Sequence, residues 1–323
     1  MPVREGNKIS AGSRARVLLL AIALVAGGRS ASGRIASDIV ADVRSAMAVG
    51  GLERAEQVLA EYRSRNSTTS EALEALSWLA RGALAAGQFD RAAALAAEAR
   101  DKASTGIQTS GTADSHLWAA LGAAIEVTAF SLADQGGRSD AVYFLRDEWN
   151  AYRDTPIGNA VRADLDLVSL EGRSAPPLEP GVALGPRLRV ETESTRQPTL
   201  LFFWAHWCQD CKAESPIVAK IVEKYRGRGL AVVAPTRRYG YVQAGLPAAP
   251  EKELPHILHV RNSFYSFLKH EPVPVTDANF RAYGVSSVPM HVLIDRRGVV
   301  RLYRPGSMSE AELEASILAV LEP

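Results

Sequence analysis

Apolar residues recur every three or four positions through the first half of the chain, which is the spacing of helices that bury one face. Between residues 35 and 170 this pattern predicts helices over Ile35–Val49, Leu52–Arg65, Ser70–Ala86, Phe89–Lys102, Ser115–Asp134, Ser139–Arg153 and Ile157–Ser169. Glycines stand where one predicted helix ends and the next begins, and glycine readily adopts the backbone conformation that ends a helix. The first half is therefore predicted to be all-helical.

Three of these helix junctions are alike, because each places a glycine just before a helix with an early alanine. They are Gly51-Leu52-Glu53-Arg54-Ala55, Gly87-Gln88-Phe89-Asp90-Arg91-Ala92 and Gly137-Arg138-Ser139-Asp140-Ala141. The first two are separated by close to the tetratricopeptide period of about 34 residues, and a predicted loop at Ser104–Ala113 delays the third. We predict a degenerate tetratricopeptide-like array, with an irregular helical bundle as the alternative. Stacked helices offer a partner-binding surface, and a dimerisation or spacer module is the other interpretation.

The second half alternates strands and helices instead. The predicted elements are Leu188–Glu193, Thr199–Ala205, Asp210–Arg226, Leu230–Ala234, the amphipathic helix Glu251–His270, Met290–Asp295, Val299–Arg304 and Ser309–Leu321. The predicted amphipathic helix carries Leu254, Ile257, Leu258, Phe264 and Leu268 on one side. Strand, helix and strand in that order imply parallel pairing and an α/β sandwich.

Prolines separate the two halves. Pro176, Pro177 and Pro180 break helicity within Gly172–Gly185. This places a helical domain at residues 35–171, a linker at 172–186 and an α/β domain at 187–323. We expect few contacts to cross the linker, so that a chain starting near Gly172 folds and acts alone.

The N-terminus has the layout of a secretory signal, predicted over residues 1–32. Basic residues precede the apolar run Val17–Ala26, and small residues follow it. This predicts a periplasmic or otherwise exported protein with no lasting membrane span, the alternative being an uncleaved anchor that tethers it. The net charge of +1 and the absence of a basic stripe favour no nucleic-acid partner.

The chain has only two cysteines, Cys208 and Cys211, directly after the apolar run Thr199–Ala205. Cysteines three apart at the start of a helix cannot join distant parts of a fold, but they can alternate between a dithiol and a disulfide. Outward-pointing helix N–H groups favour a thiolate there. The alternative is half of a zinc site, but the chain has no second cysteine pair to complete it. His256 and His259 are its only close histidine pair. We therefore expect redox chemistry with no metal and no cofactor.

The residues around the cysteines resemble a known family. Phe202–Pro216 is similar to the active-site segment of thioredoxin-fold proteins, and most of all to the exported TlpA/ResA-like thiol–disulfide oxidoreductases. Pro274–Pro289 resembles the second conserved block of that family, which ends in a cis-proline beside the cysteines. The resemblance covers roughly the last 140 residues, within the size of one domain. It implies a thioredoxin-like α/β domain behind the all-α, tetratricopeptide-like one.

The resemblance and the position of each residue suggest roles for the site. Cys208 is the candidate attacking thiolate, and Cys211, one helical turn further, resolves the mixed disulfide. Pro289 corresponds to the cis-proline that holds the Val288 carbonyl toward a bound peptide, an ordinary loop proline being the alternative. Trp207 is an aromatic flank that contacts substrate, or simply packs.

Two features depart from thioredoxin itself. Phe202 stands where thioredoxin has a buried aspartate, so Glu214 is the candidate proton relay for the buried thiol, although a solvated surface glutamate fits the sequence equally well. Asp210 lies between the cysteines, and its charge disfavours a thiolate, which leaves the direction of electron flow open.

These observations predict dithiol–disulfide exchange with a protein substrate. An upstream redox partner is expected to donate electrons to the cysteine pair or accept them from it. A peroxiredoxin is disfavoured because Ala205 occupies the position of its motif threonine. The alternative from another class is an interaction scaffold, in which the helical repeats bind a partner and the thioredoxin domain only docks.

Overall fold

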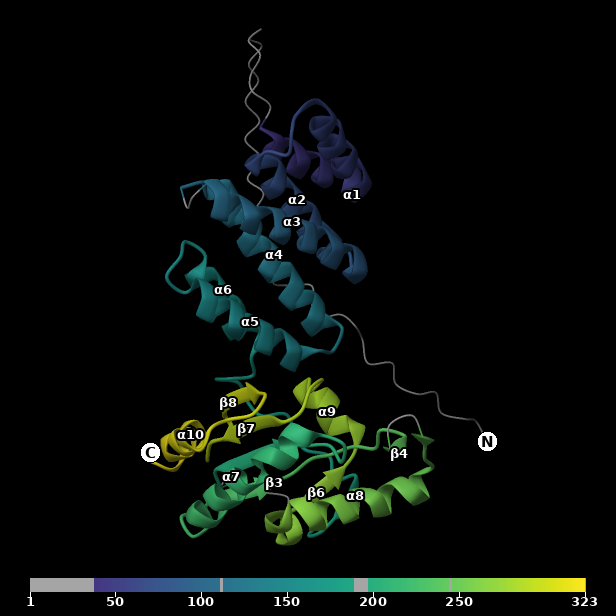
Figure 1. Ribbon diagram of the computed structural model, residues 1–323, viewed down its shortest axis with the longest axis vertical. Helices are drawn as coiled ribbons and strands as arrows, with labels where there is room; N and C mark the ends of the chain where they lie inside the picture. The colour runs from purple at the N-terminus through teal and green to yellow at the C-terminus, as the bar shows by residue number, and fades with distance from the viewer. Residues whose placement is uncertain (1–37, 111–112, 189–196, 244–245, 323) are drawn as a thin grey trace, which may run out of the picture. The chain divides into compact units, whose positions relative to one another are not determined.

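The computed structural model describes residues 38–110, 113–188, 197–243 and 246–322 of the 323-residue chain (Figure 1). The predicted signal at residues 1–32 lies outside them. The first half is all-helical as predicted, with α1 (Ile39–Arg65), α2 (Ser70–Ala85), α3 (Phe89–Ser110), α4 (Ser115–Asp134), α5 (Arg138–Tyr152) and α6 (Gly158–Val168). The tetratricopeptide-like repeat stays a prediction.

Local sequence explains where these helices begin. Asp38, Thr69 and Asp114 each accept a hydrogen bond from a backbone N–H of the first helical turn of α1, α2 and α4. Gly51 has a φ of 75°, so it divides α1 at the junction where the sequence predicts two helices.

The loop predicted at Ser104–Ala113 is wrong for most of its length, because α3 continues to Ser110. The hydroxyls of Thr105 and Thr109 each donate to a carbonyl one turn back, at 2.9 Å, which satisfies these polar side chains within the helix. Ala103 is fully buried, so this end of α3 also packs in the core. Packing therefore overrides the weak helix propensity of this segment.

The second half contains a four-stranded sheet in the order β3–β2–β7–β8. Its strands are β2 (Thr199–Phe203), β3 (Ala231–Val233), β7 (Met290–Ile294) and β8 (Val300–Pro305), with β2 parallel to β3 and the other neighbours antiparallel. Two smaller pairs join β1 (Val182–Leu184) to β6 (Val273–Val275) and β4 (Tyr241–Gln243) to β5 (Leu246–Pro247). The helices are α7 (Gln209–Arg226), α8 (Pro250–Phe264), the 3₁₀ helix η1 (Ser266–His270), α9 (Asp277–Tyr283) and α10 (Glu310–Leu321). This architecture confirms the thioredoxin-like α/β prediction.

Two predicted elements need correction. Leu188 lies outside any strand, and residues 189–193 of that predicted strand are outside the described residues. The predicted helix Glu251–His270 is divided into α8 and η1 at Tyr265, which is fully buried. Phe264, predicted on the apolar side, is 50% exposed, because the break at Tyr265 turns the chain so that Tyr265 enters the core instead.

The two sides of β2 face different cores. Leu200 and Phe202 belong to a cluster with the apolar residues of α7, α8 and α10. Leu201 and Phe203 belong to another cluster, which contains α9 and continues without interruption into α4, α5 and α6, for example at Leu145. The helical region therefore shares a hydrophobic core with one face of the sheet.

The expectation that few contacts cross residues 172–186 is wrong. The Gly172 and Ala175 N–H groups donate to the carbonyls of Val300 and Gly298 at 2.8 Å, and the Val300 N–H donates to the Arg173 carbonyl at 2.9 Å. The prolines from Pro176 onward prevent a helix, but the extended backbone just before them still pairs with the edge strand β8. The domain bounds themselves stay a prediction.

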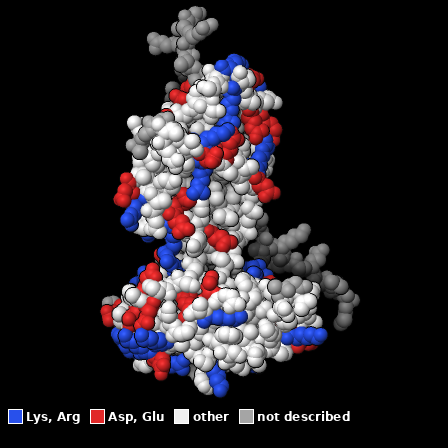
Figure 2. Space-filling model, viewed as in Figure 1, with Lys and Arg blue, Asp and Glu red and all other residues white. Residues whose placement is uncertain are grey.

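Surface charge does not favour one sign on the side of the molecule drawn in Figure 2. Lysine and arginine side chains are interspersed there with aspartate and glutamate over the described residues. This fits the net charge of +1. Among the described residues, α4 alone is long and apolar enough to cross a membrane, and Leu121 and Ile125 of that helix lie in the shared core instead.

Candidate functional site

The two cysteines lie at the start of α7 and form a disulfide. Cys208 is the N-cap residue, and its Sγ accepts a hydrogen bond from the Cys211 N–H at 3.0 Å. This is the position in which helix N–H groups stabilise negative charge on sulfur. Cys208 is 3% exposed and Cys211 is fully buried, so Cys208 alone of the pair has exposed surface.

A proline loop lies against the first cysteine. The Val288–Pro289 peptide bond is cis, and the Val288 carbonyl oxygen lies 3.7 Å from the Cys208 Sγ. Pro289 is buried, and its own carbonyl accepts the Gly306 N–H at 2.9 Å, which ties the loop to the end of β8. Residues that are some 80 positions apart in the sequence are thus brought together in the fold.

Glu214 is buried, which excludes the alternative of a solvated surface glutamate. It is 3% exposed, and its Oε1 accepts the Met308 N–H at 2.7 Å and lies 3.2 Å from Nε2 of His291. Its second oxygen, Oε2, has no hydrogen-bond partner among the described residues. Helix α7 carries Glu214 about one turn beyond Cys211, and both side chains are buried.

Sequence reasoning missed the partner of Glu214. His291 is fully buried on β7, two residues after Pro289, and its ring lies 5.4 Å from that of Phe202. The only signal in the sequence is one ionisable residue within the otherwise apolar strand Met290–Ile294. Tyr265 lies nearby, and burial together with the charge of Glu214 raises the pKa of its hydroxyl.

The segment between β3 and β6 packs against the two residues just before Cys208. His206 is 1% exposed, and its ring contacts those of Tyr239, Tyr241 and His256 at centroid distances of 5.2 to 5.7 Å. Burial, followed by the charge of His256, lowers the pKa of His206, so its imidazole is neutral near pH 7. Glu253 holds this segment in place, because its buried carboxylate accepts the backbone N–H groups of Tyr239 and Gly240.

Trp207 lies at the exposed edge of this aromatic cluster. It is 43% exposed, and its ring meets that of Tyr239 edge-on at 5.3 Å. Trp207, the aromatic flank predicted from the sequence, therefore packs against the segment between β3 and β6 and not in the core. Its exposed surface lies next to Cys208 along the chain.

An open cavity of about 590 Å³ lies beside the cysteine pair and Pro289. It is lined by Asp140, Tyr143, Arg146, Asp147, Asn150, Asp210, Ser287, Val288, Pro289, Arg304, Pro305, Gly306 and Ser307. The first five of these residues belong to α5 of the helical region. We call this cavity the α5 groove.

Comparisons with known proteins agree with this geometry. Residues 188–321 match the family described as thioredoxin-like domain. The chain is 30% identical over 157 residues to the thiol-disulfide oxidoreductase ResA of Bacillus subtilis, which covers 48% of this chain and 78% of that protein. It is 26% identical over 157 residues to the thiol:disulfide interchange protein DsbE of Xylella fastidiosa, with 48% and 72% covered.

A solved structure is also similar in sequence. A candidate thiol:disulfide interchange protein DsbE from Chlorobium tepidum is 28% identical, with 47% of this chain and 97% of that chain covered and a TM-score of 0.34. Helices α1–α6 lie outside the residues that match the thioredoxin-like family.

Proposed function

Because the chain belongs to the family of thiol–disulfide oxidoreductases that includes ResA, we propose that it exchanges dithiol and disulfide with protein substrates through Cys208 and Cys211. The observation that carries the proposal is the position of Cys208. It combines the α7 N-terminus, the Val288 carbonyl at 3.7 Å and the open α5 groove in one place. No metal or cofactor takes part in the proposed step.

The exchange proceeds in two balanced steps. The Cys208 thiolate attacks one sulfur of a substrate disulfide, forming a mixed disulfide and releasing the other substrate sulfur as a thiolate. The Cys211 thiolate then attacks the Cys208 sulfur and releases the second substrate thiolate, so the protein is oxidised and the substrate is reduced by two electrons. The same steps in reverse oxidise a substrate dithiol. An upstream dithiol or disulfide protein restores the starting state.

The buried site supports the second step. Cys211 must lose its proton before it attacks, and the fully buried thiol has no access to bulk water. We propose that Glu214 takes this proton with its unpartnered Oε2, while the Met308 N–H holds the other oxygen, 3.2 Å from the His291 Nε2. Pro289 and Val288 align the substrate backbone, and Trp207 contacts its side chains.

Insulin reduction by the purified chain tests the proposal. Cys208→Ser should abolish activity, because the attacking sulfur is lost. Cys211→Ser should complete one attack and then stop, leaving a mixed disulfide visible on a non-reducing gel. Full activity of Cys208→Ser would contradict the assignment, and an inactive parent protein would favour the interaction scaffold.

We also propose that residues 1–32 direct export and are then removed. An exported protein meets substrates that contain disulfides, which is where such exchange is useful. Mass spectrometry of the mature protein from its native cells tests this. A chain that retains residues 1–32 in the membrane fraction would instead support a tethered form.

A further inference from the structure

The α5 groove is built from two parts of the chain that lie far apart in sequence. Asp140, Tyr143, Asp147 and Asn150 follow one another at intervals of three or four residues, so they form one face of helix α5. The opposite side is formed by the loop before Pro289 and by the end of β8. A substrate segment that reaches Cys208 past Val288 therefore lies against α5.

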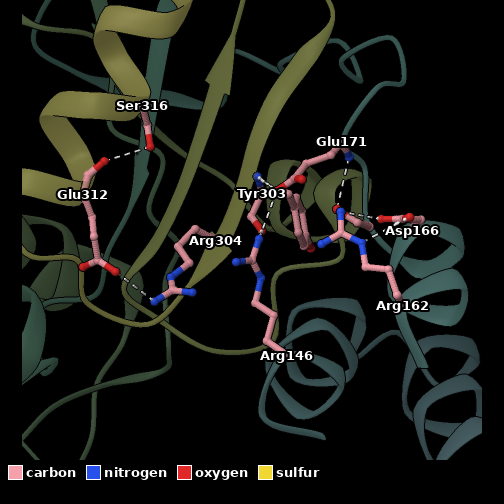
Figure 3. Close-up of polar contacts among 9 residues, drawn as sticks. Arg146, Arg162, Asp166, Glu171, Tyr303, Arg304, Glu312 and Ser316 are labelled. Atoms are coloured by element: carbon pink, nitrogen blue, oxygen red, sulfur yellow. Dashed lines mark hydrogen bonds and ion pairs between the residues drawn. The ribbon is translucent and has the colours of Figure 1, made fainter. Parts of the chain in front are cut away.

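Helix α5 is held firmly against the thioredoxin-like part. Ser139, fully buried, donates its N–H to the Gly284 carbonyl at 2.9 Å, and its Oγ accepts the Ser286 and Ser287 N–H groups at 2.9 and 3.2 Å. Two turns later in α5, Arg146 bonds Glu171 at 3.0 Å (Figure 3). This face of α5, which forms one wall of the α5 groove, is thus a fixed part of the site.

Arg146 also reaches the sheet directly. Its guanidinium lies 3.4 Å from the Tyr303 carbonyl on β8, and Figure 3 shows both residues in the junction between α5 and the sheet. Glu171 joins the same network, because its carboxylate accepts the Tyr303 N–H at 2.9 Å. Arg146 and Glu171, which are bonded to each other, therefore both contact the backbone of Tyr303 on β8.

The charges that line the groove are unequally matched. Its two arginines face carboxylates, Arg146 with Glu171 at 3.0 Å and Arg304 with Glu312 at 3.7 Å. Asp147 and Asp210 are exposed, and within the described residues neither has a cation within 4.0 Å. The unmatched charge that a substrate meets beside Cys208 is therefore negative.

Tyr143 adds an aromatic surface to the same wall. It is 54% exposed and lies between the two aspartates of α5 in the sequence. An exposed tyrosine beside a carboxylate suits the long apolar stem and charged head of lysine or arginine. The chemistry of the wall thus matches one class of side chain.

We infer that α5 is part of the substrate-binding surface, and that Asp147 selects segments with a basic residue next to the reacting cysteine. This inference rests on the proposed function, since it concerns the substrate of the same exchange. It gives the helical region a direct role in specificity, which the thioredoxin-like part alone does not supply. The exchange step itself is unchanged, with the same bonds formed and broken.

The test compares disulfide-linked dimers of three short peptides, Gly-Lys-Cys-Lys-Gly, Gly-Glu-Cys-Glu-Gly and Gly-Gln-Cys-Gln-Gly. The reduced full-length protein, in excess, is mixed with each dimer at low salt, and the loss of peptide disulfide gives the second-order rate constant of a single exchange. Peptide charge alters thiol reactivity by itself, so the measured quantity is the ratio of the lysine to the glutamate rate in each variant. Intrinsic peptide reactivity then cancels between variants.

Asp147→Asn should lower this ratio roughly two- to fivefold, as expected for one exposed charge pair, and Asp147→Lys should lower it further. The matched control is Asp101→Lys on α3, an exposed aspartate outside the groove that changes net charge equally and should leave the ratio unchanged. Raising the salt concentration should shrink the difference between Asp147→Lys and the parent.

Equal ratios for the parent, Asp147→Lys and Asp101→Lys would overturn the inference while leaving the exchange reaction intact. A parent protein that reduces none of the three dimers would contradict the proposed function instead. The two failures are therefore distinguishable in one experiment.

Discussion

Ser139 joins the helical region to the loop that carries Val288. Removing its hydroxyl therefore tests how much this junction contributes to stability and to exchange. In the folded protein the Ser139 Oγ accepts two backbone N–H groups, from Ser286 and Ser287, and also lies 2.8 Å from the Ser286 hydroxyl. Ser139→Ala deletes these three contacts and a fourth, to the Ser287 hydroxyl at 3.3 Å, with little change in volume. The bond from the Ser139 N–H to the Gly284 carbonyl survives, because it is made by backbone.

The size of the effect follows from what replaces the lost acceptor. An orphaned buried N–H costs about 1–3 kcal/mol. Ser286 is exposed, so water can bond its N–H, whereas Ser287 is only partly exposed. We therefore expect Ser139→Ala to lower the free energy of unfolding by about 1–2 kcal/mol. Exchange should slow as well, because the same loop sets the position of Val288.

Urea unfolding followed by circular dichroism measures the first effect, and insulin reduction measures the second. Ser131→Ala is the matched control, since the Ser131 hydroxyl is buried on α4 without a described hydrogen-bond partner. Removing it should be neutral or slightly stabilising. If Ser139→Ala and Ser131→Ala behave alike in both assays, the reasoning about this junction is refuted.

Three further predictions concern the rest of the chain. Burial and the charge of Glu126 raise the pKa of Asp164 to about 7, so the folded protein binds a proton there that the unfolded chain releases above pH 3.8. The free energy of unfolding should therefore fall as the pH rises from about 4 to about 7. Urea titrations across this range should show that Asp164→Asn removes about 1–2 kcal/mol of that fall, after allowance for solvent screening. If the pH profile of Asp164→Asn equals that of the parent, Asp164 is not the group responsible. A chain that begins at Gly172 should be less soluble and less active than the full chain, because it uncovers the core around Tyr303; a soluble, fully active fragment would contradict a shared core. Glu214→Gln should lengthen the lifetime of the mixed disulfide roughly a hundredfold in acid-quenched samples while leaving the first attack intact, and an unchanged lifetime would remove it from the proton path.

Much of this molecule could be predicted from its sequence because the signals are local. The helix starts at Asp38, Thr69 and Asp114 depend on side chains within three residues of the backbone groups they bond. The position of Cys208 as an N-cap follows in the same way from a strand, a turn and a helix in order. That Pro289 lies beside the cysteines can be predicted only from the family resemblance.

The remaining features depend on packing between residues far apart in the chain. Nothing near Ser139 indicates that its hydroxyl will meet Ser286, almost 150 positions later. The apolar faces of α4 and α5 predict burial, but not that the sheet supplies part of the cover. The prolines after Gly172 indicate a boundary because they end helices, whereas the residues just before these prolines pair with β8 and the turn that precedes it.

The reduction potential of the Cys208–Cys211 couple tests the central claim most directly. The full-length protein is equilibrated in glutathione buffers of graded potential, and the fraction oxidised is read after alkylation by mass spectrometry. A redox-active pair should give a single two-electron transition between about −270 and −120 mV, the range of thiol–disulfide exchange proteins. A pair that stays oxidised below about −300 mV, as structural disulfides do, would contradict the account.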